Sequence, residues 1–128
     1  RGKIVGMDIN DRTCCQGVRI EIEIGDQTVE ADLDRIAAKH GPFDVIVDDA
    51  GHVPSAQVFC YKAMLKYLKP EGLYILEDLV GMTGPFDSPE CTEFLAKIGS
   101  DVMQKELDKI ESICFSYGTS VTRLKKAK

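Results

Sequence analysis

The chain has 128 residues, of which 44% are hydrophobic and 29% charged, the composition of one globular domain large enough to bury a core. Its net charge of −5 argues against nucleic acid or an anionic membrane surface as the main partner, because both favour a basic protein face. No apolar run approaches the ~20 residues that cross a bilayer, and the five cysteines lack zinc-ligand spacing, so we expect a cytoplasmic protein with reduced thiols.

Strand and helix patterns alternate along the chain, which predicts an α/β fold with a mostly parallel, doubly wound sheet. Residues 3–7 are largely apolar and end at Asp8, so we expect a strand there. Residues 18–24 alternate strictly between apolar and polar side chains. This pattern predicts a strand at a sheet edge whose polar face, with Glu21 and Glu23, lies in water.

The middle of the chain continues this alternation. Residues 29–40 predict a helix that a Gly-Pro pair ends. The nearly continuous apolar run 43–47 predicts a buried central strand that ends in Asp48 and Asp49. A second helix follows, with Pro54 near its first turn. The expected apolar side of this helix comprises Val58, Phe59, Leu65 and Leu68.

The last part of the chain predicts one buried strand, one helix and a hairpin. The buried strand covers residues 73–76 and ends in a second acid pair. A cap residue and a proline start a helix at Ser88. Residues 110–116 and 119–124 predict two antiparallel strands joined by a Tyr-Gly turn.

The acid pairs Asp48-Asp49 and Glu77-Asp78 are the strongest chemical signal in the sequence. In open α/β sheets, ligands bind outside the carboxyl ends of the strands. If the two strands are neighbours, up to four carboxylates crowd one edge of the sheet, and a hard cation such as Mg²⁺ or Ca²⁺ would offset their repulsion. The alternative is that some of these acids cap helices or bind loop amides.

Other candidate residues lie at the same edge. His52, three residues after the first acid pair, could take a proton from a substrate hydroxyl, or it could be structural. His40 ends a helix, and we interpret it as structural. Asp8 ends a strand where nucleotide-binding folds place an acid on ribose hydroxyls. Asp26 and Gln27 could contact an adenine, or they could form an ordinary turn.

Two segments carry a resemblance to a known family. The stretch FDVIVDDAGH at residues 43–52 and the stretch LKPEGLYILED at residues 68–78 resemble the metal-dependent macrolide sugar O-methyltransferases and the cephalosporin hydroxylase-like family. Both belong to the class I S-adenosylmethionine-dependent methyltransferases. The resemblance extends from Val5 to the terminal hairpin.

The resemblance implies an S-adenosylmethionine-dependent O-methyltransferase of the class I fold, acting on a hydroxyl of a small molecule such as a sugar or a glycosylated natural product. The implied Mg²⁺ ligands are Asp49, Glu77 and Asp78. The implied general base is His52. The implied cofactor-binding residues are Asp8, Asp26, Gln27 and Asp48.

The sequence departs from the family at two places. Ala50-Gly51 stands where relatives have a Gly-Ser pair, but the spacing from acid to histidine is kept. The chain also contains no G-x-G motif, although the family begins with a strand and a glycine-rich cofactor loop. We therefore expect residues 1–128 to be one domain that is incomplete at its N-terminus. The strands ending at Asp8 and at Asp49 should then not pair, because the absent strand lies between them.

The sequence is compatible with one main alternative function and disfavours two others. A non-catalytic methyltransferase-like binding or scaffold module is the main alternative, because the cofactor loop is missing. A short-chain dehydrogenase is disfavoured because no Tyr-x-x-x-Lys motif occurs, and a receiver domain because no strand-end lysine is suitably placed. The sequence leaves the oligomeric state open, a homo-oligomer included.

Overall fold

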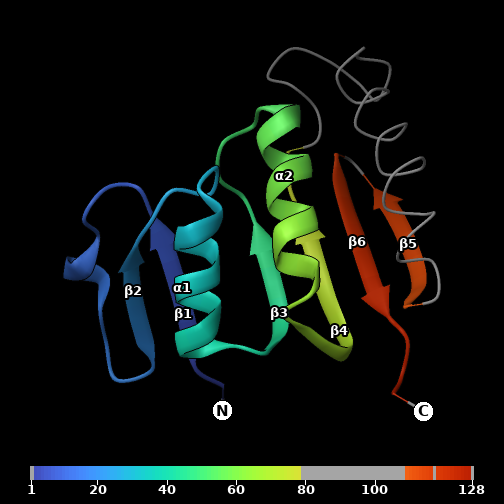
Figure 1. Ribbon diagram of the computed structural model, residues 1–128, viewed down its shortest axis with the longest axis horizontal. Coiled ribbons are helices and arrows are strands. Elements are labelled where there is room, and N and C mark those ends of the chain that lie inside the picture. Colours follow the sequence, from blue (N-terminus) through green and yellow to red (C-terminus); the bar gives the residue numbers. More distant parts are fainter. Residues whose placement is uncertain (1, 79–108, 117, 128) are drawn as a thin grey trace.

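The structure, a computed structural model, describes residues 2–78, 109–116 and 118–127. In chain order the elements are β1 (Ile4–Asp8), a 3₁₀ turn (Thr13–Cys15), β2 (Ile20–Ile24), α1 (Glu30–His40), β3 (Phe43–Asp48), α2 (Pro54–Leu65), β4 (Leu68–Leu76), β5 (Ile110–Ser116) and β6 (Thr119–Leu124) (Figure 1). The expected helix starting at Ser88 and the loop before it lie outside the described residues. None of the described helices has the length and apolar content needed to span a bilayer.

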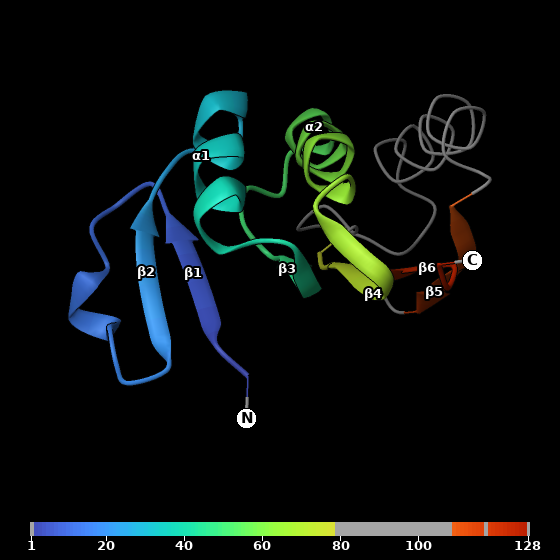
Figure 2. The ribbon, with the colours of Figure 1, turned by 60° about the horizontal axis from the view of Figure 1, so that its bottom comes forward.

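The strands of the described residues form two separate sheets. β1 and β2 pair in parallel, and the second sheet has the order β3-β4-β6-β5. β3 and β4 are parallel, whereas β6 runs antiparallel to both β4 and β5. Both α1 and α2 lie on the same face of these sheets (Figure 2). The expected α/β architecture with a C-terminal antiparallel hairpin is confirmed.

The core lies between α2 and the second sheet. Tyr61 of α2 and Tyr74 of β4 are fully buried, and their rings meet edge to face with centroids 4.9 Å apart. Tyr61 donates a hydrogen bond to Thr122 Oγ1 of β6 at 2.9 Å. Because a buried hydroxyl needs a partner, this bond also fixes how α2 sits over β6.

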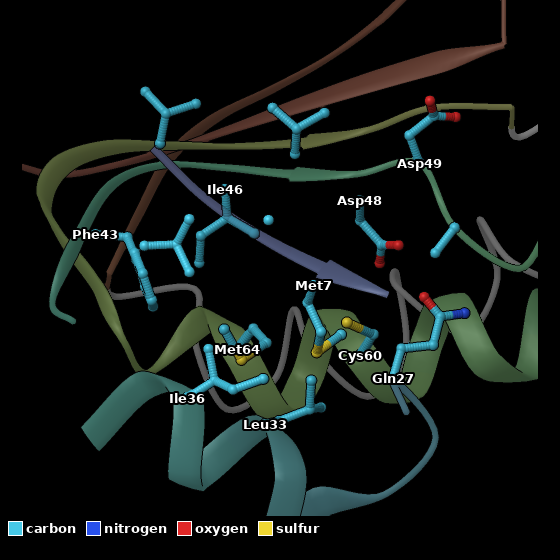
Figure 3. Close-up of a pocket in the computed structure, with 15 residues that line it drawn as sticks. Met7, Gln27, Leu33, Ile36, Phe43, Ile46, Asp48, Asp49, Cys60 and Met64 are labelled. Carbon is cyan, nitrogen blue, oxygen red and sulfur yellow. The ribbon is translucent and has the colours of Figure 1, made fainter. Parts of the chain in front are cut away.

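β1 and β3 do not pair with each other, as expected from the sequence. In the described part of the chain, β1 pairs with β2 and β3 pairs with β4. Between β1 and β3 lies a groove of about 310 Å³, lined by Val5, Met7, Leu33, Ile36, Val45 and Val47 among others (Figure 3). The groove is therefore apolar and follows two strand edges.

Two expectations about burial and length are wrong. β3 was expected to be buried on both faces, but Val45 and Val47 are 48% and 57% exposed, because one edge and one face of β3 have no neighbour among the described elements. β4 begins at Leu68 rather than at residue 73, so Leu68 belongs to a strand and not to α2. In the pairing of β3 with β4, Phe43 lies opposite Leu68, and the register shifts between Phe43 and Val45. This irregularity explains how β4 can contain a Pro-Glu-Gly segment.

β2 shows a further difference from the sequence pattern. Glu23 was expected on a wet face but is only 9% exposed, whereas Ile24 is 50% exposed. α1 covers the polar face of β2, and it places Lys39 Nζ and His40 Nε2 at 2.6 and 2.7 Å from Glu23 Oε1. The hydrogen bond from Lys39, followed by that with His40, lowers the pKa of Glu23 from 4.5 to about 2. The alternation of apolar and polar residues correctly predicts a strand at β2, but it does not indicate which face of the strand α1 covers.

The charge on Glu23 should contribute to stability in a pH-dependent way. Because the pKa of Glu23 is lowered in the folded protein, its ionised carboxylate stabilises the fold at pH values above the ordinary pKa of 4.5. This contribution to stability is lost as the pH falls toward 2. We expect Glu23→Gln to lower the free energy of unfolding at pH 7 by ~1–3 kcal/mol. The difference from wild type should shrink between pH 4.5 and pH 2. Urea unfolding of the full natural protein across this range measures it.

The matched control is Glu21→Gln on the same strand, where the side chain is 39% exposed and pairs with Lys3. Because solvent screens that pair, its removal should cost less stability than the loss of the Glu23 charge. Equal losses for the two variants, or a Glu23→Gln effect that persists unchanged at pH 2, would contradict this explanation.

Candidate functional site

The two acid pairs leave the sheet side by side at the carboxyl ends of β3 and β4. The parallel register places Asp48 opposite Leu76. One residue further on, the backbone N–H of Glu77 donates to the carbonyl of Asp48 at 2.9 Å. This bond continues the pairing beyond the end of β4, so Asp49 and Glu77 begin their loops at the same edge.

Three side chains meet above this edge. Asp49, His52 and Asp78 each offer a ligand atom, and these atoms lie within 4.8 Å of one another. His52 Nε2 is 3.5 Å from Asp78 Oδ2. All three residues are exposed, so a substrate or an ion can reach them. The structure thus brings together two of the three expected metal ligands and the expected base.

The chemistry of this cluster suits a hard divalent cation. Two carboxylates held close together repel each other, and carboxylate oxygens are the ligands that Mg²⁺ and Ca²⁺ prefer. Asp78 has a φ of 50°, which is uncommon for a residue other than glycine and is found preferentially at functional sites. Glu77 is half-buried and lies outside the cluster of three, although it is the neighbour of Asp78 in the chain.

Asp48 points away from this cluster. Its side chain is buried and faces the groove between β1 and β3, close to Cys60 (Figure 3). Burial raises its pKa, and the hydroxyl of Tyr74, which donates to Asp48 Oδ2 at 2.9 Å, opposes that rise. Burial and the nearby Asp48 also raise the pKa of the Cys60 thiol to about 12, so this cysteine is not a reactive thiolate. Contact of Asp48 with a cofactor stays a prediction.

The remaining expected cofactor residues line a second pocket of about 530 Å³ beside the cluster. Asp8, Asp26 and Gln27 line it together with Asp49 and Gly51. The pocket therefore joins the carboxyl ends of β1 and β2 to the loop that follows β3. This is the place where open α/β sheets bind nucleotides.

Asp8 and Asp26, two of the three acids that line this pocket, are held by local bonds. Asp8 accepts hydrogen bonds from the backbone N–H of Asn10 at 2.8 Å and from Arg12 Nε at 3.1 Å, and these bonds lower its pKa. Asp26 Oδ1 accepts from both the N–H and the hydroxyl of Thr28, which lowers the pKa of Asp26. Asp26 thus makes the turn that the sequence left open, and its Oδ2 can still accept a bond from a ligand.

Gln27 connects the pocket to the loop after β3. Its buried amide contacts Gly51, with Nε2 3.4 Å from the carbonyl oxygen. With the amide turned over, its nitrogen donates to Asp48 Oδ1 at 3.3 Å and its oxygen accepts from the N–H of Gly51 at 3.2 Å. In either orientation the side chain of Gln27 holds the segment between Asp49 and His52.

Sequence reasoning missed three side chains of this region: Arg12, Gln57 and Tyr74. Arg12 holds Asp8, Tyr74 holds Asp48, and Gln57 donates through Nε2 to the carbonyl oxygen of Glu77 at 3.2 Å. A polar residue within the apolar side of a helix or strand is the available signal for Gln57 and Tyr74. Nothing in the spacing of the sequence points to Arg12.

The chain is similar in sequence to O-methyltransferases of antibiotic biosynthesis. Mycinamicin VI 2''-O-methyltransferase of Micromonospora griseorubida is 37% identical over 97 residues, which cover 72% of this chain and 24% of that protein. Demethylmacrocin O-methyltransferase of Streptomyces fradiae is 38% identical over 79 residues, covering 62% of this chain and 20% of that protein. This chain thus spans about a quarter or less of the length of these relatives. No family model matches it.

Solved structures resemble nearly the whole chain. The MycE methyltransferase of the mycinamycin pathway, in complex with Mg, SAH and mycinamycin VI, matches with a TM-score of 0.81 at 30% identity, over 98% of this chain and 37% of MycE. An O-methyltransferase from Bacillus cereus in complex with SAH matches with a TM-score of 0.63 at 15% identity, over 98% of this chain and 63% of that protein. The second match concerns the fold alone.

Proposed function

We propose that this chain, a relative of the macrolide sugar O-methyltransferases with their class I methyltransferase fold, carries the metal-binding edge of an S-adenosylmethionine-dependent O-methyltransferase. The proposed reaction transfers a methyl group to a hydroxyl of a glycosylated small molecule. The observation that supports it most is the meeting of Asp49, His52 and Asp78 within 4.8 Å, beside the pocket that Asp8 and Asp26 line.

The proposed Mg²⁺ site uses Asp49, Glu77 and Asp78. Bound Mg²⁺ would supply a Lewis acid that lowers the pKa of a substrate hydroxyl. His52 would accept the proton of that hydroxyl on Nε2, and the carboxylate of Asp78, 3.5 Å from this nitrogen, would stabilise the positive charge that the ring then carries. Positioning of the two reactants by the pocket would supply much of the remaining rate.

The proposed S-adenosylmethionine site is the pocket beside the cluster. A carboxylate has about four lone-pair positions, so Asp8 keeps acceptor capacity for ribose hydroxyls while Asn10 and Arg12 hold it. Asp26 would accept a hydrogen bond from the adenine amino group through Oδ2, and Gln27 lies next to it. These bonds would fix the cofactor relative to the loop that carries Asp49 and His52.

We also propose that a further strand of the same polypeptide fills the groove between β1 and β3. Unpaired strand edges beside an apolar groove are costly, because their backbone groups lack partners and their side chains contact water. A strand there would join the two sheets into one. The structure of the full natural protein is the test: a strand hydrogen-bonded to both β1 and β3 is expected, and direct pairing of β1 with β3 would contradict the proposal.

The first test of function is the metal dependence of methyl transfer. EDTA should abolish transfer from S-adenosylmethionine to a glycosylated acceptor, and Mg²⁺ should restore it. Asp49→Ala and Glu77→Ala should each lose metal affinity but keep the fold. Asp44→Ala is the control, because this exposed acid lies on β3 away from the site and pairs with Lys69. Full activity in EDTA would refute the metal site, and a wild type without cofactor affinity would favour a binding module.

The second test concerns the base. We expect His52→Ala to lower kcat ~10²–10⁴-fold, the usual contribution of a general base. The affinities for metal and cofactor should hardly change. Steady-state kinetics and calorimetry on the same variant separate the two effects. If metal binding is lost instead and kcat at saturating metal is unchanged, His52 is a ligand and not the base.

A further inference from the structure

A buried glutamine of α2 contacts the loop that carries two of the proposed Mg²⁺ ligands. Gln57 is 4% exposed, and its Nε2 donates to the carbonyl oxygen of Glu77 at 3.2 Å. Because a buried amide without a partner is destabilising, this bond determines where the side chain lies. Gln57 is therefore placed to act on the backbone at the end of β4.

The peptide that accepts this bond joins Glu77 to Asp78. The backbone N–H of Glu77 is already held by the carbonyl of Asp48 at 2.9 Å, so the two bonds fix Glu77 from both sides. Asp78 then turns with a φ of 50°, a left-handed conformation that is uncommon for a residue other than glycine. Such a turn persists only where its surroundings hold it.

We propose that Gln57 is a positioning residue of the metal site. Its amide fixes the plane of the Glu77–Asp78 peptide, and this plane sets the direction in which the Asp78 carboxylate meets Asp49 and His52. Gln57 would act on the metal site through this peptide and not as a ligand of the metal. The inference rests on the proposed Mg²⁺-dependent function and adds a residue to it.

Gln27 makes a comparable contact with the other loop, where its amide holds Gly51. It is a poorer subject for a test, because Gln27 also lines the proposed cofactor pocket. A change at Gln27 would alter cofactor and metal affinity together. Gln57 has no place in the lining of that pocket, so its effect on the metal can be measured separately.

The test is Gln57→Met in the full natural protein, because methionine keeps the length of the side chain and removes the N–H donor. Free Mn²⁺ measured by paramagnetic resonance gives the metal affinity, and calorimetry gives the SAH affinity. We expect the Mn²⁺ dissociation constant to rise ~10–100-fold, the usual effect of losing a residue that orients a ligand. SAH affinity should be unchanged. Gln16→Met, at an exposed glutamine that directly follows the 3₁₀ turn, is the control and should match wild type.

The outcomes separate this inference from the proposed function. A wild type that does not bind Mn²⁺ refutes the proposed metal site and the role of Gln57 with it. If wild type binds Mn²⁺ and Gln57→Met binds it equally well, Gln57 does not position the site. If Gln57→Met does not fold, Gln57→Asn is measured instead. Its shorter amide cannot reach the Glu77 carbonyl, so Mn²⁺ affinity equal to wild type would also overturn the inference.

Discussion

The candidate site depends on the parallel pairing of β3 with β4. This pairing places Asp48 opposite Leu76, and the bond from the N–H of Glu77 to the Asp48 carbonyl extends it to the first loop residue. The two acid pairs therefore start from the same edge, although their first members, Asp48 and Glu77, lie 29 positions apart in the sequence. The helix between the strands returns the chain in the parallel direction, and it also contributes Gln57. One β-α-β unit thus supplies the proposed metal ligands, the proposed base and Gln57, the proposed positioning residue of the Glu77–Asp78 peptide.

The same geometry limits how many charges meet at the edge. Successive residues of a strand point to opposite faces, so Asp48 turns toward the groove while the chain carries Asp49 out to the cluster. Burial raises the pKa of Asp48, and the Tyr74 hydroxyl stabilises its charged form. The cluster itself then holds the two carboxylates of Asp49 and Asp78 beside the His52 ring. Because the two carboxylates of the Asp48-Asp49 pair point in different directions, fewer negative charges meet in the cluster. Less electrostatic repulsion therefore opposes a compact cation site.

Sequence patterns predicted the strands and helices well where periodicity decides structure. The ends of β1, β3 and β4 were placed correctly because an apolar run stops there at an acid, and the site was inferred from those ends. The face of β2 was not predictable, because alternation does not say that α1 brings Lys39 and His40 onto Glu23. The start of β4 at Leu68 was missed because Pro70 and Gly72 are signals of a turn. Gln57 was missed because its role arises from a contact across 20 positions of the chain, for which one sequence gives no spacing rule.

The most direct measurement of the central claim is the anomalous scattering of Mn²⁺ in crystals of the full natural protein grown with SAH. The account predicts a peak about 2–2.6 Å from carboxylate oxygens of Asp49 and Asp78, the distance range of hard divalent cations, with SAH in the pocket that Asp8 and Asp26 line. Crystals that contain ordered SAH and Mn²⁺ but show no peak at these two carboxylates would contradict it.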